Sequence, residues 1–188
     1  MQNPFQIGPR LYLRPLEVSD AAAACAWLNH PEVRRFLSRD TPLSQASEEG
    51  FIRSLGTSDA IFVIVLHQGE RGIGLVGLHG FRNSSRRGTL GITIGEPDCW
   101  GQGYGTEAIE LLLDWAFDEL GLHRVELCVY ATNARGIACY EKLGFVHEGA
   151  KREAMLENGA HVDEVQMGLL AREWRARGPL DPEATSLS

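Results

Sequence analysis

Residues 100–106, Trp-Gly-Gln-Gly-Tyr-Gly-Thr, have the types and spacing best suited to binding a phosphate group. A β-branched segment, residues 91–94, precedes them and an amphipathic segment follows, which predicts a strand, a turn and a helix in that order. The alternating Gly101, Gly103 and Gly105 leave backbone N–H groups uncovered, and a helix start adds a partial positive charge of about +0.5. The same glycines would also suit a tight strand-to-helix turn that binds no ligand.

Two common nucleotide-binding motifs do not fit this turn. The dinucleotide fingerprint G-x-G-x-x-G needs its third glycine one residue after Gly105, and the Walker loop needs Gly-Lys-Ser/Thr. The chain has only two lysines, Lys142 and Lys151, and neither lies near the turn. Residues 72–77 do match G-x-G-x-x-G, but a polar turn and another strand follow them. We therefore interpret these glycines as a feature between strands, such as a β-bulge, rather than as a dinucleotide site.

Two motifs, residues 100–108 (WGQGYGTEA) and then residues 133–145 (NARGIACYEKLGF), resemble the GNAT superfamily of acetyl-CoA-dependent N-acetyltransferases. The chain looks most similar to the RimJ/RimL-like branch, with polyamine acetyltransferases nearby, and the resemblance covers residues 11–170. It implies a mixed α/β (α+β) fold with a mostly antiparallel central sheet flanked by helices. The sheet would splay open between its fourth and fifth strands, near Ile94 and Val125.

The resemblance also implies that acetyl-CoA is the cosubstrate. The glycine turn would hold the pyrophosphate, and the exposed backbone of residues 92–94 would pair with the pantetheine arm as an added strand does. The family pattern begins with Gln or Arg where this chain has Trp100. The resemblance therefore implies a phosphate cradle made of the backbone amides of the turn, without a matching side chain at its first position. The candidate cofactor-binding residues are Ile92, Thr93, Ile94, Trp100, Gly101, Gln102, Gly103, Tyr104, Gly105, Thr106, Asn133 and Lys142.

Tyr140 aligns with the family's tyrosine in N-x-x-x-x-x-x-Y, which implies that it is the general acid for the leaving thiolate. Asn133 is a good N-cap for a helix over residues 134–143. Seven residues make two helical turns, so Asn133 and Tyr140 face one side of that helix, about 10 Å apart. A phenol has a pKa of about 10 and a thiol one of about 8.5, so proton donation is nearly balanced. The alternative role for Tyr140 is half-buried packing.

The general base stays open at this point. Some GNAT enzymes place a glutamate on the strand before the asparagine, where this chain has Cys128. Glu126 lies two residues earlier on the same face and is the candidate base, with Glu96 as a further carboxylate, although each could equally be an ordinary surface residue. A water chain, or an amine that arrives neutral, would also serve.

The acceptor implied by the resemblance is a primary amine that attacks the thioester directly. A protein N-terminal α-amine is the first interpretation, and a small amine such as a polyamine or an aminoglycoside is the alternative. The segment between the first two long strands resembles the family's acceptor-binding region, with Arg34, Arg35, Phe36 and Arg39 as candidates or as a solvated basic loop. A CoA-binding sensor domain without turnover, and a nucleotide-dependent oxidoreductase, are alternatives of other classes.

Composition narrows the class of protein further. A length of 188 residues favours one domain, and a net charge of −7 argues against general binding of nucleic acid phosphates. No apolar run of 18 residues or signal peptide is present, so we expect a soluble, cytoplasmic protein away from the membrane. The four cysteines show neither metal-ligand nor pairing patterns, which predicts reduced thiols and no metal. A homodimer is a further expectation.

Hydrophobic periodicity and turn residues predict the remaining elements. One acetyltransferase domain would span residues 1–188, with a core over 10–172 and a flexible tail over 173–188. The expected strands cover residues 10–15, 60–66, 73–81, 89–94, 124–129, 146–154 and 161–170, the last two joined by an Asn158-Gly159 turn. The expected helices cover residues 21–29, 32–37, 44–55, 103–120 and 134–143, with a polar loop at 38–42.

Overall fold

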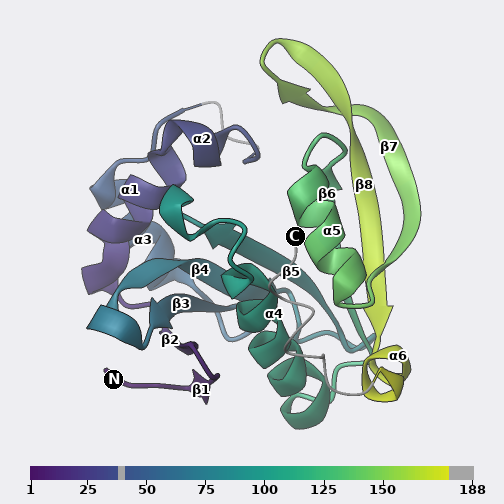
Figure 1. Ribbon diagram of the computed structural model, residues 1–188, viewed down its shortest axis with the longest axis horizontal. Helices are drawn as coiled ribbons and strands as arrows, with labels where there is room; N and C mark the ends of the chain where they lie inside the picture. Colours follow the sequence, from purple (N-terminus) through teal and green to yellow (C-terminus); the bar gives the residue numbers. More distant parts are fainter. Residues whose placement is uncertain (38–40, 178–188) are drawn as a thin grey trace.

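An eight-stranded sheet separates two groups of helices (Figure 1). The computed structural model describes residues 1–37 and 41–177. Residues 38–40 of the predicted loop at 38–42 and residues 178–188 of the predicted tail therefore lie outside it. The spatial order of the strands is β1-β2-β3-β4-β5-β6-β8-β7. Their bounds are β1 Gln6–Ile7, β2 Leu11–Pro15, β3 Ala60–Leu66, β4 Gly72–His79, β5 Arg87–Ile94, β6 Arg124–Tyr130, β7 Val146–Glu157 and β8 Ala160–Leu170. The predicted mixed α/β fold is confirmed.

The pairing of β5 with β6 differs from that of every other neighbouring pair among the described strands. The other pairs are antiparallel, whereas β5 and β6 are parallel and pair only at Arg87↔Arg124, Gly88↔Val125 and Thr89↔Glu126. Beyond Thr89 the two strands separate. This confirms the splay predicted between the fourth and fifth strands, which are β5 and β6 because the unpredicted two-residue β1 precedes the predicted set.

Helices cover both faces of the sheet. One group consists of α1 (Ala21–Asn29), α2 (Pro31–Arg34) and α3 (Gln45–Ser54), and the other of α4 (Tyr104–Asp114), α5 (Ala134–Lys142) and α6 (Ala171–Ala176). Short 3-10 turns are η1 Val18–Asp20, η2 Gln68–Glu70 and η3 Pro97–Cys99. The π-helical turn η4 (Trp115–Glu119) continues directly from α4, so the helix predicted over 103–120 is present but its last part is π-helical. Across the described residues, none of the helices is long and apolar enough to cross a membrane.

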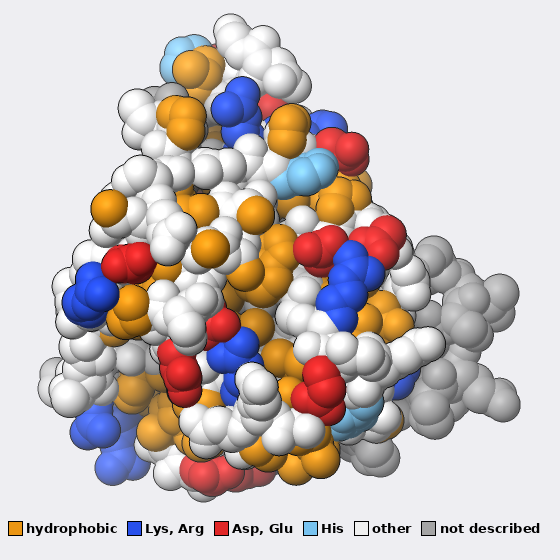
Figure 2. Space-filling view, turned by 90° about the vertical axis from the view of Figure 1, so that its left-hand side faces the viewer, with side chains coloured by type: hydrophobic (Ala, Val, Ile, Leu, Met, Phe, Trp, Pro, Cys, Tyr) orange, Lys and Arg blue, Asp and Glu red, His pale blue; other side chains and the backbone are white. Residues whose placement is uncertain are grey.

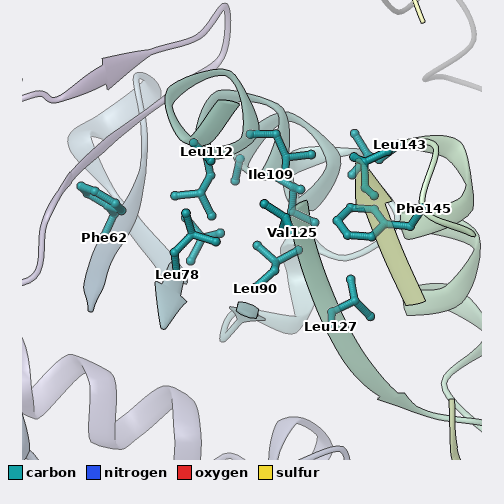
Figure 3. Packing of buried hydrophobic residues seen from close by; sticks show 14 of the residues in the cluster. Phe62, Leu78, Leu90, Ile109, Leu112, Val125, Leu127, Leu143 and Phe145 are labelled. Atoms are coloured by element: carbon teal, nitrogen blue, oxygen red, sulfur yellow. The ribbon is translucent and has the colours of Figure 1, made fainter. Parts of the chain in front are cut away.

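The alternation of side chains along the strands produces two cores. On β3, Phe62 and Ile64 join the large cluster beneath α4, whereas Val63 and Val65 pack with Trp27 of α1 on the opposite face. The large cluster holds α4 and α5 against the sheet (Figure 3). Its central members include Leu78, Leu90, Ile109, Leu112, Val125, Leu127, Leu143 and Phe145. The cluster therefore fixes the two helices that flank the splay.

The glycine run at 72–77 lies within β4 and forms no ligand loop. Pairing with β3 shifts register between Ile64 and Val65, opposite Gly74 and Gly72, which confirms the predicted bulge. A Cβ on Gly74 would lie 2.0 Å from the Thr93 carbonyl oxygen, so close strand approach explains a glycine there. Since β4 leads into β5 and not into a helix, the dinucleotide interpretation is rejected.

The prediction that the chain frays from residue 173 is wrong for residues 173–176. These residues belong to α6, where Trp174 is only 9% exposed and its indole N–H donates to Asp114 Oδ1 at 3.0 Å. The indole also packs near Phe117, with ring centroids 6.2 Å apart. Burial of one large aromatic side chain docks this segment, whereas its Arg-rich sequence resembles a solvated tail.

We expect Trp174→Ala to lower the free energy of unfolding by about 3–5 kcal/mol, because it removes a buried aromatic side chain and a hydrogen bond. Urea unfolding followed by far-UV circular dichroism measures the change. Arg172→Ala is the control, since that side chain is 74% exposed on the same helix. Equal unfolding free energies for the two variants would show that α6 does not dock.

Candidate active site

A cavity of about 960 Å³ occupies the space where β5 and β6 separate. One end is bounded by the glycine turn and α5, and the other by side chains from α1, α2 and α3. On the side of the molecule that carries these three helices, hydrophobic side chains show between the charged ones (Figure 2). The cavity thus extends from the predicted phosphate-binding turn to a mostly apolar part beside α1, α2 and α3, which we call the acceptor-side chamber.

The glycine turn leads directly into α4 without a side-chain cap. Gly101 and Gly103 have φ angles of 72° and 77°, and Gly103 is the N-cap residue. A left-handed conformation costs a residue with a side chain about 1–2 kcal/mol, which explains glycine at these positions. The first helical bond runs from Glu107 N to Gly103 O at 3.1 Å, so the amides of Tyr104, Gly105 and Thr106 have no acceptor at i−4. Uncovered amides at a helix start suit an anion, so together with the glycine turn they form a candidate phosphate cradle.

A carboxylate on α4 attaches the turn to β2. Glu107 is only 8% exposed, and its Oε1 accepts hydrogen bonds from the backbone amides of Arg10 and Leu11 at 2.8 and 3.2 Å. Arg10 Nε donates to Glu107 Oε2 at 2.7 Å, and its Nη1 donates to the Gln102 carbonyl at 2.8 Å. No local pattern predicts this clamp, because Arg10 and Glu107 lie 97 residues apart in the chain.

Trp100 contacts both sides of the splay. Its indole N–H donates to the Ile94 carbonyl at 2.9 Å, which ties the turn to the end of β5. The guanidinium of Arg135, from the first turn of α5, lies 4.0 Å from the centroid of the Trp100 ring. This stack brings a cation to the cavity beside the cradle, although Arg135 was not among the predicted binding residues.

The helix α5 presents Tyr140 to the cavity and begins as predicted. Asn133 Oδ1 accepts from Gly136 N at 3.0 Å, which confirms the N-cap. Tyr140 is partly buried and meets Phe145 edge to face at 5.9 Å. Burial raises the pKa of Tyr140 well above its ordinary value, and the adjacent Cys139 adds to the rise. The phenol therefore remains protonated at neutral pH.

The structure brings most of the predicted site residues to this one cavity. Those that line it are Ile92, Thr93, Ile94, Trp100, Gly101, Gly103, Tyr104, Gly105, Thr106, Asn133, Tyr140 and Lys142. Gln102 is not among the described lining residues, because its side-chain amide donates to the Asp98 carbonyl within the turn. A Cβ on Gly105 would meet nothing closer than Ile94 Cγ1 at 3.8 Å, so that position stays open.

Glu126 also lies outside the described lining of the cavity. It belongs to the segment where β5 and β6 still pair, and its carboxylate accepts from Arg124 Nε at 2.9 Å with Arg87 at 3.7 Å. This ion-paired position disfavours Glu126 as the base. Cys128 does line the cavity, but burial raises the pKa of its thiol, so it remains protonated near neutral pH.

The acceptor-side chamber is mostly hydrophobic with few charges. Two carboxylates line it, Glu48 of α3, which is only 2% exposed, and Glu164 of β8. Of the four candidates predicted for this region, only Phe36 lines the cavity, while Arg35 pairs with Glu157 at 3.3 Å and Arg39 lies outside the described residues. The apolar lining comes from Leu28, Val33, Phe36, Leu37, Phe51, Ile61 and Leu75.

Comparison with known proteins agrees with this geometry. Residues 10–146 match the family model of the acetyltransferase (GNAT) domain. The chain is 29% identical over 171 residues to the uncharacterized N-acetyltransferase p20 of Bacillus licheniformis, covering 88% of this chain and 95% of that protein. It is 37% identical over 101 residues to the "Putative ribosomal N-acetyltransferase YdaF" of Bacillus subtilis, covering 54% of this chain and 55% of that protein.

A solved structure with the same fold is that of spermidine N-acetyltransferase from Vibrio cholerae, in complex with CoA and spermine. It aligns with a TM-score of 0.83 and 27% identity, covering 89% of this chain and 99% of that chain. The family match spans well over half of the sequence and includes the splayed strands, the glycine turn and all of α5. The chain therefore belongs to the GNAT family and is an acetyl-CoA-dependent N-acetyltransferase.

Proposed function

We propose that the acceptor is a small primary amine of the polyamine class. The observation that carries this proposal is the acceptor-side chamber, in which the carboxylates of Glu48 and Glu164, the latter also paired with Lys151 at 2.6 Å, lie among apolar side chains. Methylene chains suit the apolar lining, and a distal ammonium group suits a carboxylate. The likeness to a spermidine N-acetyltransferase supports the same acceptor class. This order reverses the one expected from sequence, which placed a protein N-terminal α-amine first.

A protein N-terminal α-amine is the second candidate acceptor. It is supported by the 37% identity to YdaF, whose name refers to ribosomal N-acetylation. A CoA-binding sensor without turnover is not retained, because the chain belongs to a family of acetyltransferases.

In this proposal the cradle binds the cosubstrate through its pyrophosphate. The uncovered amides at the start of α4 would hold the phosphates, with the cation of Arg135 nearby on the Trp100 ring. The unpaired edge of β5 from Ile92 to Ile94 would pair with the pantetheine arm. Such an alignment would direct the thioester toward the point where β5 and β6 meet.

Tyr140 would protonate the thiolate that leaves when the amine attacks. Its hydroxyl is protonated at neutral pH, as a phenol of ordinary pKa about 10 would be, and the raised pKa extends the protonated range to higher pH. Because the pKa of Tyr140 is raised, acid catalysis would be lost only when the pH rises through that raised value. No covalent enzyme intermediate is needed, since the amine itself attacks the thioester.

Gly103→Ala should weaken binding of acetyl-CoA on the order of tenfold. The turn of the free variant would relax from φ 77° to relieve about 1–2 kcal/mol of strain, and binding would have to restore it. A cost of about 1.4 kcal/mol corresponds to a factor of ten in affinity. Isothermal titration calorimetry measures the dissociation constant. Gly56→Ala is the matched control, because a Cβ there would meet nothing within 4 Å. Identical affinities for the two variants would argue against the cradle.

Tyr140→Phe should lower kcat about 100-fold near neutral pH, in line with the loss of one general acid. The dissociation constant of acetyl-CoA should stay nearly unchanged, since the ring and its packing on Phe145 remain. Release of free CoA in steady-state assays gives kcat, and calorimetry gives the affinity. Tyr12→Phe serves as control, because Tyr12 is buried on the α1 face of the sheet. A parallel loss of kcat and affinity in Tyr140→Phe would contradict the acid role.

An acceptor panel tests the proposed substrate class. We expect kcat/KM for spermidine to exceed that for butylamine, N-terminal peptides and aminoglycosides, because only a polyamine combines methylene chains with a distal ammonium. Glu164→Gln should reduce the preference for spermidine over butylamine, which lacks the distal charge, while leaving the butylamine value nearly unchanged. Mass spectrometry of the products identifies the acetylated nitrogen. A preference for N-terminal peptides would favour the second candidate.

A further inference from the structure

We infer that His79 is the general base that deprotonates the acceptor ammonium, and that Asp59 is the positioning residue that orients its imidazole. This inference rests on the proposed function, since it concerns a cationic amine in the same cavity. Neither residue was a candidate in the sequence, where Glu126 was the named base.

His79 lies at the vertex of the splay, the point where β5 and β6 begin to separate, and on the acceptor side. It is the last residue of β4 and pairs with Thr89 of β5, which is the last β5 residue that still pairs with β6. Its side chain is among those that line the cavity, together with Gly77 and Gly91 on the same face. A thioester directed along the unpaired edge of β5 would end near this vertex, which is where an attacking amine must lose its proton.

A hydrogen bond to Asp59 defines the orientation of the imidazole. His79 Nδ1 lies 3.3 Å from Asp59 Oδ1, and the same oxygen accepts the backbone amide of Gly80 at 3.2 Å. A carboxylate accepts hydrogen bonds only, so it selects the tautomer with the proton on Nδ1 and leaves a lone pair on Nε2. The Asp–His pair therefore has the arrangement of an oriented base.

The Nε2 atom of His79 lies over a glycine of β5. A Cβ built on Gly91 would lie 3.6 Å from His79 Nε2, and Gly91 has no side chain to occupy that space. An acceptor nitrogen at this place would be within reach of Nε2. A residue larger than glycine at this position would cover the nitrogen, so the sequence at β5 is compatible with a base on β4.

Other groups around the cavity are less suited to accept the proton. Glu164 is held by Lys151 at 2.6 Å, and the Cys128 thiol and the Tyr140 phenol stay protonated because burial raises their pKa values. Glu48 lies on α3 and lines the chamber, where its carboxylate suits the distal ammonium of the acceptor.

The proposed step balances atoms and charge. The acceptor ammonium gives one proton to His79 Nε2, and the neutral nitrogen uses its lone pair to form a bond to the acetyl carbon. The carbon–sulfur bond then breaks, and the thiolate takes the proton of the Tyr140 hydroxyl. Tyr140 regains a proton from the nitrogen, which becomes the amide, and His79 releases its proton to water. The net products are the acetylated amine, free CoA and one proton.

The test is the pH dependence of kcat/KM for spermidine in wild type and in His79→Gln. Near pH 7 the variant should lose about 100-fold, as expected for one general base. Without the base, only the neutral amine reacts, and its fraction rises about tenfold per pH unit below an amine pKa of about 10. The ratio of wild type to variant should therefore fall about tenfold per unit as the pH is raised, whereas a structural defect would lower activity equally at every pH.

Other ionisable side chains surround the cavity, but the substitution leaves them in place, so they act on both proteins. Three of them lie at the vertex, Arg87, Arg124 and Glu126. The others line the cavity from α3, η3, α4, α5, β6 and β8: Glu48, Cys99, Tyr104, Arg135, Cys139, Tyr140, Lys142, Cys128, Tyr130 and Glu164.

An acceptor amine with its own pKa of about 7 gives a second readout. At about pH 8 it is largely neutral, so His79→Gln should then acetylate it at nearly the wild-type rate.

Three further variants complete the test. Asp59→Asn should show the same pH signature with a smaller loss, because the carboxylate that selects the tautomer is gone. His161→Gln, an exposed residue on β8, is the matched control and should equal wild type. A pH-independent ratio for His79→Gln, or the pH signature in Glu48→Gln in its place, would overturn the inference. Failure of the proposed function would differ, because wild type itself would then acetylate no small amine, whichever residue is changed.

Discussion

The parallel pairing of β5 and β6, and its end at Thr89 and Glu126, is the constraint on which the site depends. Each strand is held on its other side by a full antiparallel partner, β4 for β5 and β8 for β6. The two halves of the sheet therefore keep their shape while the space between them opens. That space is the cavity, and the free edge of β5 is the only backbone surface of the strand left to a ligand.

Packing around this opening positions α4, which begins at the proposed phosphate cradle, and α5, which carries the proposed acid Tyr140. The large hydrophobic cluster fixes α4 and α5, while the Glu107–Arg10 clamp fixes the turn before α4 to β2. The side-chain contact between Thr106 Oγ1 and Cys139 Sγ, at 3.3 Å, joins the two helices directly. A cradle of backbone amides must keep its shape to bind an anion, and these contacts provide that rigidity without placing side chains in it.

Charge is distributed unevenly along the cavity. Cationic Arg135 lies at the cradle end, where phosphates would bind, and the carboxylates of Glu48 and Glu164 lie at the chamber end, where an ammonium would bind. Tyr140 lines the cavity from α5, and the inferred base His79 lines it from β4, on the opposite side of the splay. An amine and a thioester could therefore enter from different sides and meet between an acid and a base.

Local patterns in the sequence were enough to predict most of the fold and one half of the candidate site. Alternating β-branched runs, the glycine turn and the Asn133 cap act over a few residues, so their structure follows from neighbours in the chain. The glycine cradle and Tyr140 were found for this reason, together with their resemblance to a family.

The rest of the candidate site, and part of the fold, depended on tertiary structure alone. Asp59 meets His79 from 20 residues away, Glu107 meets Arg10 from 97 residues away, and Trp174 becomes a core residue only when it docks beside Asp114. Glu126 was placed correctly on its strand but turned out to be ion-paired outside the cavity. Periodicity defines which face of an element is buried, but the partner across that face is selected by how distant segments pack, and no spacing along the chain encodes it.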